Sequence, residues 1–265
     1  PEATGDLKTL IIPFNLSDKT AWKSSEIEVL NELFFDNTPN ISGNTILSYP
    51  SFKEYYETAS FNQLSMSGLV TSAYNSGVRS SAVNNDSSYN TLFTLLKNAV
   101  SWAQKQYPNE DWDKYDTNND GYVDNVHLIS NYSVSNSEWG IPLWPHMAQT
   151  GFNPVQGELT INTYTVSAKN TSQSDAYTTI HEQGHVFGLD DYYNYSEENS
   201  SADYVGYADM QSGNIFDWNS FSKLEIGWVK PYVVNGELDT TTITIDAAAT
   251  SGDCILIPAD HSTWN

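Results

Sequence analysis

A fifteen-residue stretch, TIHEQGHVFGLDDYY from Thr179 to Tyr193, requires one helix followed by one reversal of the chain. On a helix, His181 and His185 lie on one face about one turn apart, because they are four residues apart. Two imidazoles at that separation can hold one Zn²⁺. Gly188 ends the helix, since glycine readily takes the left-handed conformation that turns a chain back. The turn brings the acidic pair that follows toward the two histidines.

Glu182 follows the first histidine directly, so its carboxylate is expected beside the metal rather than facing it. A carboxylate in that place can take a proton from a metal-activated water, which is the role of a general base. Either Asp190 or Asp191 can complete the ligand set after the turn. The stretch therefore predicts a catalytic zinc site.

The charge balance excludes two classes of partner. Eleven Lys and Arg against 33 Asp and Glu give a net charge of −22. A field of that sign repels phosphate backbones and anionic lipid headgroups, so neither nucleic acid nor a membrane surface is expected as a partner.

The single cysteine, Cys254, excludes an internal disulfide and a zinc site built from cysteines. We expect a monomer.

Helical and strand patterns alternate through the first 170 residues, which predicts an α+β fold. The longest helix is expected over Tyr89–Gln106, with a core stripe of Leu92, Leu95, Leu96, Ala99 and Ala103. Residues 75–88 and 132–141 are rich in Ser and Asn and are expected as loops. Further strands are expected over 7–14, 64–74, 126–130 and 159–167, and further helices over 25–35 and 51–58.

Two more helices are expected over residues 175–189 and 217–226, the second with Phe221 and Leu224 facing inward. From about Pro231 the sequence changes to Thr-rich alternation, which is typical of strands. The predicted organisation is a catalytic domain over residues 1–230 and a short β-rich C-terminal segment over 231–265. This segment is expected to be the start of a further β domain.

The zinc stretch resembles the metzincin-type zinc peptidases, whose pattern is HExxHxxGxx followed by His or Asp. Counting from His181 places that last ligand at Asp191. Metzincins also carry a methionine in a tight turn beneath the zinc, and Met210 in YADMQSG corresponds to it. Longer segments between about Leu7 and Pro231 resemble the immune inhibitor A family: FKEYYETASFNQLSMSG, DTNNDGYVDNV, LWPHM, HEQGHVFGLDDYY and DMQSGNIFDWNSFSKLEIGWVKP.

The resemblance implies a zincin fold, in which a twisted mixed sheet is crossed by the zinc helix and the cleft lies between two halves. It also implies an extracellular, secreted bacterial endopeptidase made with a propeptide. The expected ligands are His181, His185 and Asp191, with Glu182 as base and proteins or peptides as substrates. Two alternatives are a catalytically silent zincin that binds a protein or glycan, and a thermolysin-like site whose third ligand is Glu197 or Glu198.

A second candidate metal site lies in DTNNDGYVD. Its oxygen ligands match the first nine positions of a calcium loop: Asp116, Asn118, Asp120, the Tyr122 carbonyl and Asp124. The twelfth position holds His127 instead of Glu, so an EF-hand is excluded and a calcium loop before a strand is expected. The alternative is a turn whose side chains cap their own backbone.

Some remaining side chains are assigned by their position in the sequence. Tyr192, Tyr193 and Tyr207 are candidates to stabilise an oxyanion. His146 is expected to be structural or to form a subsite, and His127 and His261 are expected to be ordinary side chains.

Overall fold

The computed structural model describes residues 3–36, 51–169, 173–193, 205, 208–212, 217–234 and 242–257. Its centre is a mixed six-stranded sheet in the order β2-β1-β4-β6-β5, with β3 also paired to β1. The strands are β1 (Gly5–Asn15), β2 (Leu64–Val70), β3 (Tyr74–Asn75), β4 (Val126–Ser130), β5 (His146–Gln149) and β6 (Thr163–Ala168). All the pairings are parallel except that of β5 with β6. The α+β class expected from the sequence is therefore confirmed.

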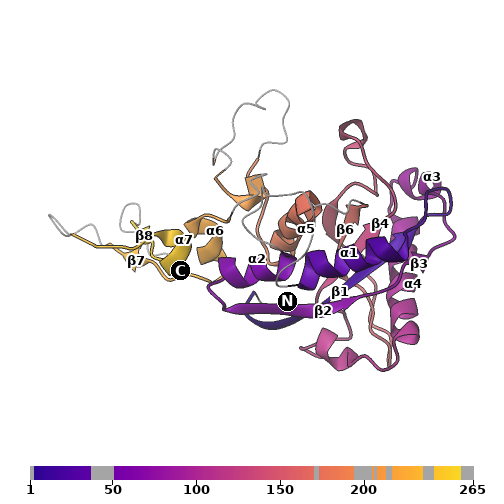
Figure 1. The fold of residues 1–265 in the computed structure, drawn as a ribbon, viewed down its shortest axis with the longest axis horizontal. Helices are drawn as coiled ribbons and strands as arrows, with labels where there is room; N and C mark the ends of the chain where they lie inside the picture. The colour runs from indigo at the N-terminus through magenta and orange to yellow at the C-terminus, as the bar shows by residue number, and fades with distance from the viewer. Residues whose placement is uncertain are drawn as a thin grey trace.

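Helices cover both faces of this sheet (Figure 1). One core cluster joins side chains of α1 (Ser24–Phe35), α2 (Phe52–Ala59) and α5 (Gln173–Val186) to Leu7 and Ile11 of β1. A second cluster joins α4 (Asn90–Gln106) to Leu10 and Ile12 of the same strand. Because successive strand residues point to opposite faces, α4 lies on one face and α5 on the other.

Strong periodicity located the long elements correctly. All five residues of the predicted stripe on α4 are at most 3% exposed, and the strand expected over 7–14 is β1. Residues 75–88, expected as a loop, contain the short helix α3 (Ser80–Asn84). Asp18 accepts hydrogen bonds from the Ser80 backbone N–H and hydroxyl, both at 2.7 Å, and so fixes the start of α3 from a distant part of the chain.

Helix α6 (Ser220–Glu225) corrects an expectation, because Phe221 is 49% exposed rather than buried. Ser222 and Lys223 are buried in its place. The Ser222 hydroxyl donates to Asp209 Oδ2 at 2.6 Å, and the Lys223 ammonium donates to Asp217 Oδ2 at 2.7 Å. Paired polar groups therefore face inward on this helix, which a hydrophobic pattern could not predict.

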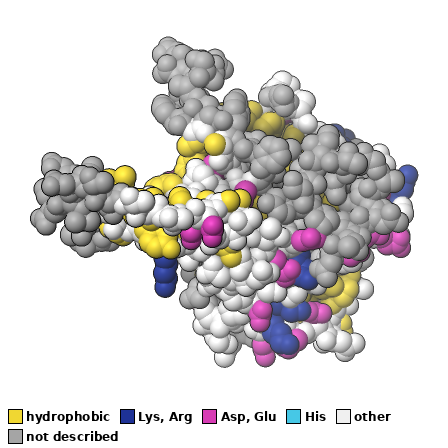
Figure 2. Space-filling view, turned by 60° about the vertical axis from the view of Figure 1, so that its left-hand side comes forward, with side chains coloured by type: hydrophobic (Ala, Val, Ile, Leu, Met, Phe, Trp, Pro, Cys, Tyr) yellow, Lys and Arg dark blue, Asp and Glu magenta, His cyan; other side chains and the backbone are white. Residues whose placement is uncertain are grey.

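The C-terminal part carries a two-stranded parallel sheet of β7 (Tyr232–Val233) and β8 (Ile255–Leu256) and the short helix α7 (Ala248–Ser251). Large apolar side chains are exposed on it, with Tyr232, Val233, Ile255 and Ile257 each more than 40% exposed. Figure 2 shows hydrophobic side chains along this projecting part.

The short single-turn helices are η1 (Trp112–Tyr115), η2 (Asn136–Glu138) and η4 (Met210–Ser212). None of the described helices is long and apolar enough to cross a bilayer.

Candidate metal centre

Helix α5 is held against the core by its first half. Ala176 and Ile180 are buried among side chains of α1 and α2. The Tyr56 hydroxyl, from α2, donates to the Ile180 carbonyl at 2.7 Å. The second half of α5 then presents its histidines to a cleft between this helix and β5.

His181, His185 and Asp191 come together after the turn. Their ligand atoms all lie within 4.8 Å of one another, and no other such group of three or more His, Cys, Asp or Glu occurs in the described part of the chain. Asp191 Oδ1 lies 2.9 Å from His181 Nε2 and 3.3 Å from His185 Nε2. Gly188, at φ +100°, makes the reversal that a residue with a side chain would resist. Asp190 is exposed.

Both imidazole rings are oriented by backbone carbonyls. His181 Nδ1 lies 3.0 Å from the Met210 carbonyl, and His185 Nδ1 lies 2.6 Å from the Leu189 carbonyl. A carbonyl can only accept, so each Nδ1 carries a proton, and each Nε2, which faces Asp191, is the nitrogen that would bind a metal in place of a proton. This tautomer is the one that ligates a metal. The donor set, two neutral imidazoles and a carboxylate, fits the three protein ligands of a catalytic Zn²⁺.

Local electrostatics favour a cation at this point. Burial is the largest single influence on the pKa of His185 and lowers it, but the hydrogen bonds with Asp191 and the Leu189 carbonyl and the charges of Asp191 and Glu182 together raise the pKa of that imidazole to about 9. The Asp191 carboxylate therefore attracts positive charge to the Nε2 edge of the two rings.

Glu182 lines the same cleft and is 6% exposed. Burial raises the pKa of its carboxyl to about 7, while the neighbouring imidazoles and a hydrogen bond from the Met147 backbone act in the opposite direction. A buried carboxyl beside a metal-ligand set is the arrangement expected of a group that accepts and returns a proton near neutral pH.

Gln211 lies behind the ligands and was not singled out from the sequence. Its amide nitrogen lies 3.2 Å from the His181 carbonyl and 3.3 Å from His185 Nδ1. Its amide oxygen accepts from Trp218 Nε1 at 3.1 Å. A Cβ on Gly184 would lie 2.3 Å from that oxygen, so a side chain there requires Gln211 to move. The only available signal was its position next to Met210, which is fully buried in η4.

His127 connects the sheet to helix α5. It is 1% exposed on β4, and its Nε2 lies 2.8 Å from Gln183 Oε1, within the HEQGH segment. Its other ring nitrogen is hydrogen-bonded to the Thr165 hydroxyl. Burial lowers the pKa of His127 to about 3, with the Gln183 hydrogen bond acting weakly against this. His127 is therefore neutral and serves packing, in line with the ordinary role expected from the sequence.

The cleft has a volume of about 280 Å³. Its outer wall includes Trp139, which is 62% exposed, and Tyr193, whose ring stacks on that of His181 at 6.2 Å. His146 also lines it, but its two nitrogens are engaged by the Trp144 carbonyl at 2.6 Å and the Tyr164 hydroxyl at 3.0 Å. Of the tyrosines considered as oxyanion stabilisers, Tyr193 thus lines the cleft. The Tyr192 hydroxyl is instead hydrogen-bonded to the Ser222 hydroxyl at 3.3 Å.

Several sequence-based candidates lie outside the described residues: Tyr207, Glu197, Glu198 and His261.

The second candidate metal loop is closed by its own hydrogen bonds. The Asp116 carboxylate accepts from the backbone N–H groups of Asp120 and Gly121, both at 2.9 Å. Asp124 Oδ2 accepts from the backbone and hydroxyl of Thr117 at 2.8 and 2.7 Å. Asn118 Nδ2 donates to Asp120 Oδ2 at 2.9 Å, and Tyr122 N donates to Asp120 Oδ1 at 2.9 Å. This is the geometry of a self-capping turn, and calcium binding stays a prediction.

No protein-family model matches the chain. No curated protein matches it in sequence.

Proposed function

We propose that this chain is a zinc-dependent endopeptidase with a zincin fold, and that Glu182 is its general base. The observation that carries the proposal is the convergence of His181, His185 and Asp191 within 4.8 Å at a cleft that Glu182 also lines. The mixed sheet and the helix that crosses it support the same assignment. The proposed substrates are proteins or peptides, and secretion is proposed on the family resemblance alone.

Bound at these three residues, Zn²⁺ would polarise the scissile carbonyl and acidify a water molecule. Glu182 takes a proton from the attacking water on its carboxylate and then delivers it to the nitrogen of the leaving amine. Its burial in the cleft suits this exchange, because burial raises the pKa of the carboxyl and so makes the carboxylate a stronger base. Trp139 and Tyr193 line the cleft where a peptide would lie.

The test is cleavage of a denatured protein by the zinc-loaded chain and by Glu182→Gln prepared identically. We expect the variant to keep one zinc per chain and to lose activity by at least about 100-fold, as for loss of a general base. Full activity in the zinc-loaded variant would overturn the role of Glu182. Zinc bound without cleavage by the wild-type chain would favour the alternative, a catalytically silent binding module.

Calcium is proposed at the loop of Asp116, Asn118, Asp120, Tyr122 and Asp124 as a structural ion. A calcium titration followed by thermal unfolding tests it, with Asp120→Asn as the variant. We expect calcium to raise the unfolding temperature of the wild-type chain but not that of the variant. Equal temperatures with calcium and with a chelator would leave the loop as a self-capping turn.

A further inference from the structure

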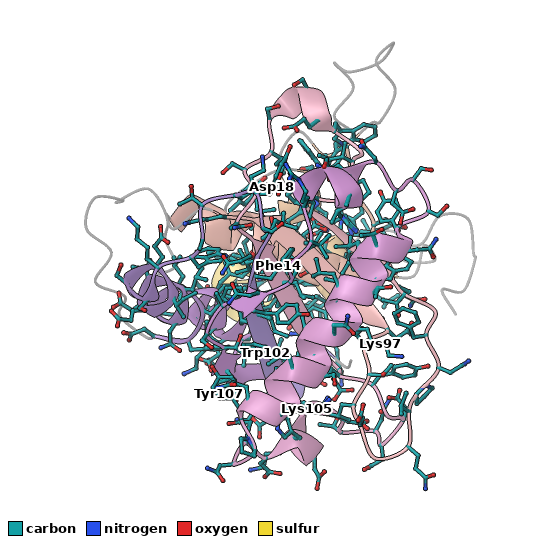
Figure 3. All side chains as sticks on the ribbon, turned by 90° about the vertical axis from the view of Figure 1, so that its right-hand side faces the viewer. Phe14, Asp18, Lys97, Trp102, Lys105 and Tyr107 are labelled. Atoms are coloured by element: carbon teal, nitrogen blue, oxygen red, sulfur yellow. The ribbon has the colours of Figure 1, made fainter. Side chains whose placement is uncertain are left out.

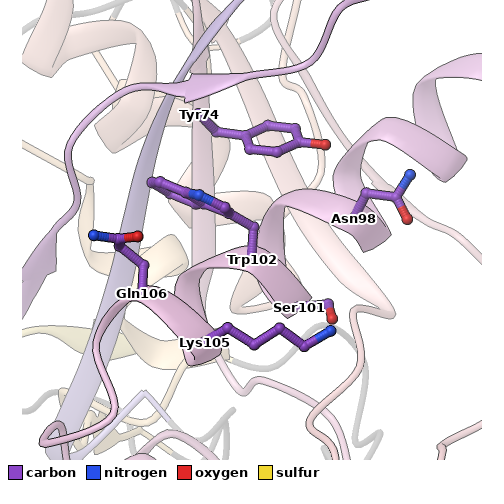
Figure 4. A pocket seen from close by; sticks show the side chains of 6 residues that line it. All are labelled: Tyr74, Asn98, Ser101, Trp102, Lys105 and Gln106. Carbon is purple, nitrogen blue, oxygen red and sulfur yellow. The ribbon is translucent and has the colours of Figure 1, made fainter.

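A second pocket lies on the outer surface of α4, on the face of the sheet opposite to the metal centre. Five of its six lining residues come from α4 at helical spacing: Asn98, Ser101, Trp102, Lys105 and Gln106. The sixth, Tyr74 of β3, reaches over them (Figure 4). Figure 3 shows the same side of the molecule, with Trp102 and Lys105 along the outer side of this helix. The pocket is therefore separate from the cleft of the proposed peptidase.

An aromatic wall forms one side of this pocket. The rings of Tyr74 and Trp102 lie 5.4 Å apart at 45°, and Tyr107 meets Trp102 edge-on at 6.4 Å. The Tyr107 hydroxyl in turn accepts from the Ser72 backbone N–H at 2.7 Å. This stacking holds Trp102 in place while the ring stays partly exposed. The pocket therefore has a fixed apolar surface.

The polar side chains of the pocket are not used by the protein itself. Within the described part of the chain, no protein group hydrogen-bonds to the side chains of Asn98, Ser101 or Gln106. Gln104, on the same helix but outside the pocket, instead donates to the Leu159 carbonyl at 2.8 Å. Lys105 has no carboxylate within 4.0 Å among the described residues. Amide, hydroxyl and ammonium groups thus surround the aromatic wall and are available to a ligand.

Charge and size narrow the ligand class. The net charge of −22 disfavours a polyanion, and the Lys105 ammonium disfavours a cation. The volume of about 310 Å³ is at the small end of ligand pockets, the size of a single ring with its substituents. A neutral ligand with many hydroxyl groups and one apolar face meets all these conditions. We propose that this pocket binds a neutral pyranose unit of a glycan, independently of the peptidase site.

The C–H face of the sugar packs on Trp102, where apolar contact with an aromatic ring is favourable. The amides of Asn98 and Gln106 each offer a donor and an acceptor, which matches hydroxyl groups that are both. Lys105 donates to hydroxyl oxygens. Such a site would hold the protein at a polysaccharide surface while its cleft remains open on the other face of the sheet.

The test is affinity electrophoresis of the chain through gels that contain one polysaccharide each: mannan, xylan, a β-glucan or polygalacturonate. Glu182→Gln serves as the background, so the result does not depend on proteolysis. We expect retardation by at least one neutral polysaccharide, and an affinity at least about tenfold lower in Trp102→Ala, equivalent to about 1.4 kcal/mol. Because Trp102→Ala also removes packing, the double variant of the exposed Asn98→Ala and Gln106→Ala is compared with it.

Thr94→Ala, an exposed position on α4 outside the pocket, is the matched control and should bind as the parent does. Lys105→Gln should keep binding within about threefold, because a glutamine still donates to hydroxyls. The proposal is overturned if no neutral polysaccharide retards the parent chain, if only polygalacturonate does, or if the double variant binds as tightly as Thr94→Ala.

Discussion

At the scale of single residues, the two acids after Gly188 differ clearly in position. Asp191 faces both imidazoles, with its Oδ1 at 2.9 and 3.3 Å from their Nε2 atoms, whereas Asp190 is exposed. We expect Asp191→Ala to weaken zinc binding by more than about 100-fold, beyond the loss seen when a residue only supports a ligand. Asp190→Ala, the matched control, should bind zinc as the wild type does. Competition with a fluorescent chelator measures both, and equal loss in the two variants would remove the ligand assignment.

The close approach of Gln211 to Gly184 leads to a second prediction at this scale. An alanine at 184 places a Cβ 2.3 Å from Gln211 Oε1, so we expect Gly184→Ala to lower the free energy of unfolding by about 1–3 kcal/mol through overpacking. Gln211→Ala removes the obstacle, and the double variant should lose less than the sum of the two single variants by about 1 kcal/mol. Denaturant unfolding of the metal-free chain measures all three. Strict additivity would show that the two residues do not interact.

At the scale of elements, β4 and α5 are joined by His127, which is neutral in the fold. Its pKa is about 3 when folded, because of burial, and about 6.5 in an unfolded chain. The unfolded chain therefore binds the extra proton below pH about 6.5, and stability falls as the pH is lowered through this window. Between pH 6.5 and pH 5 this group alone should cost about 1.6 kcal/mol.

The variant His127→Asn isolates that contribution. The rings of Phe34 and Phe52 and the polar groups of Thr165 and Gln183 face this position, and none of them carries a charge. Unfolding free energies of the metal-free wild-type chain and the variant are compared from pH 7 to pH 5. We expect the difference between them to narrow by about 2 kcal/mol as the pH falls. Parallel curves would show that His127 takes up a proton in the folded chain.

The elements predicted correctly from the sequence are those whose own hydrophobic periodicity determines which face is buried. The stripe on α4 and the apolar run of β1 determine which face is buried, since each has the period of its structure. Helix α3 was not predicted, because the hydrogen bond that fixes its first residue comes from Asp18, which is distant in the chain. Residues 159–161, expected in a strand with β6, leave the sheet instead, because the Thr160 N–H donates to the Gly121 carbonyl at 2.9 Å.

The same distinction applies to the candidate site. The histidine spacing and the turn are local features, so the residues alone predicted both histidines and one of two acids, and the resemblance to the metzincins selected Asp191, the acid that the structure brings to the histidines. Gln211 and the contact of His127 with Gln183 join segments that are distant in the chain. Neither pairing follows from the local sequence, although Gln211 lies in the YADMQSG segment, and only the packing of η4 and β4 against α5 reveals these contacts.

At the scale of the whole molecule, the net charge of −22 should steer the substrates of the proposed peptidase. Its field reaches about 30 Å at 0.01 M ionic strength but only about 8 Å at 0.15 M. We therefore expect kcat/KM for a Lys- and Arg-rich peptide to fall severalfold between these salt concentrations. An uncharged peptide with the same cleavage site should change little. If both peptides respond equally to salt, the dependence comes from the protein's own stability and not from attraction of the substrate.

The two carbonyls that hold the histidine rings have a further consequence. Met210 and Leu189 fix the rings through hydrogen bonds that do not involve an ion, so the ligand geometry belongs to the folded chain itself. Metal exchange should then be faster than unfolding, and the site should accept Co²⁺ at temperatures where the fold is intact. The visible absorption of that ion would report the coordination directly, which makes this centre accessible to spectroscopy without refolding.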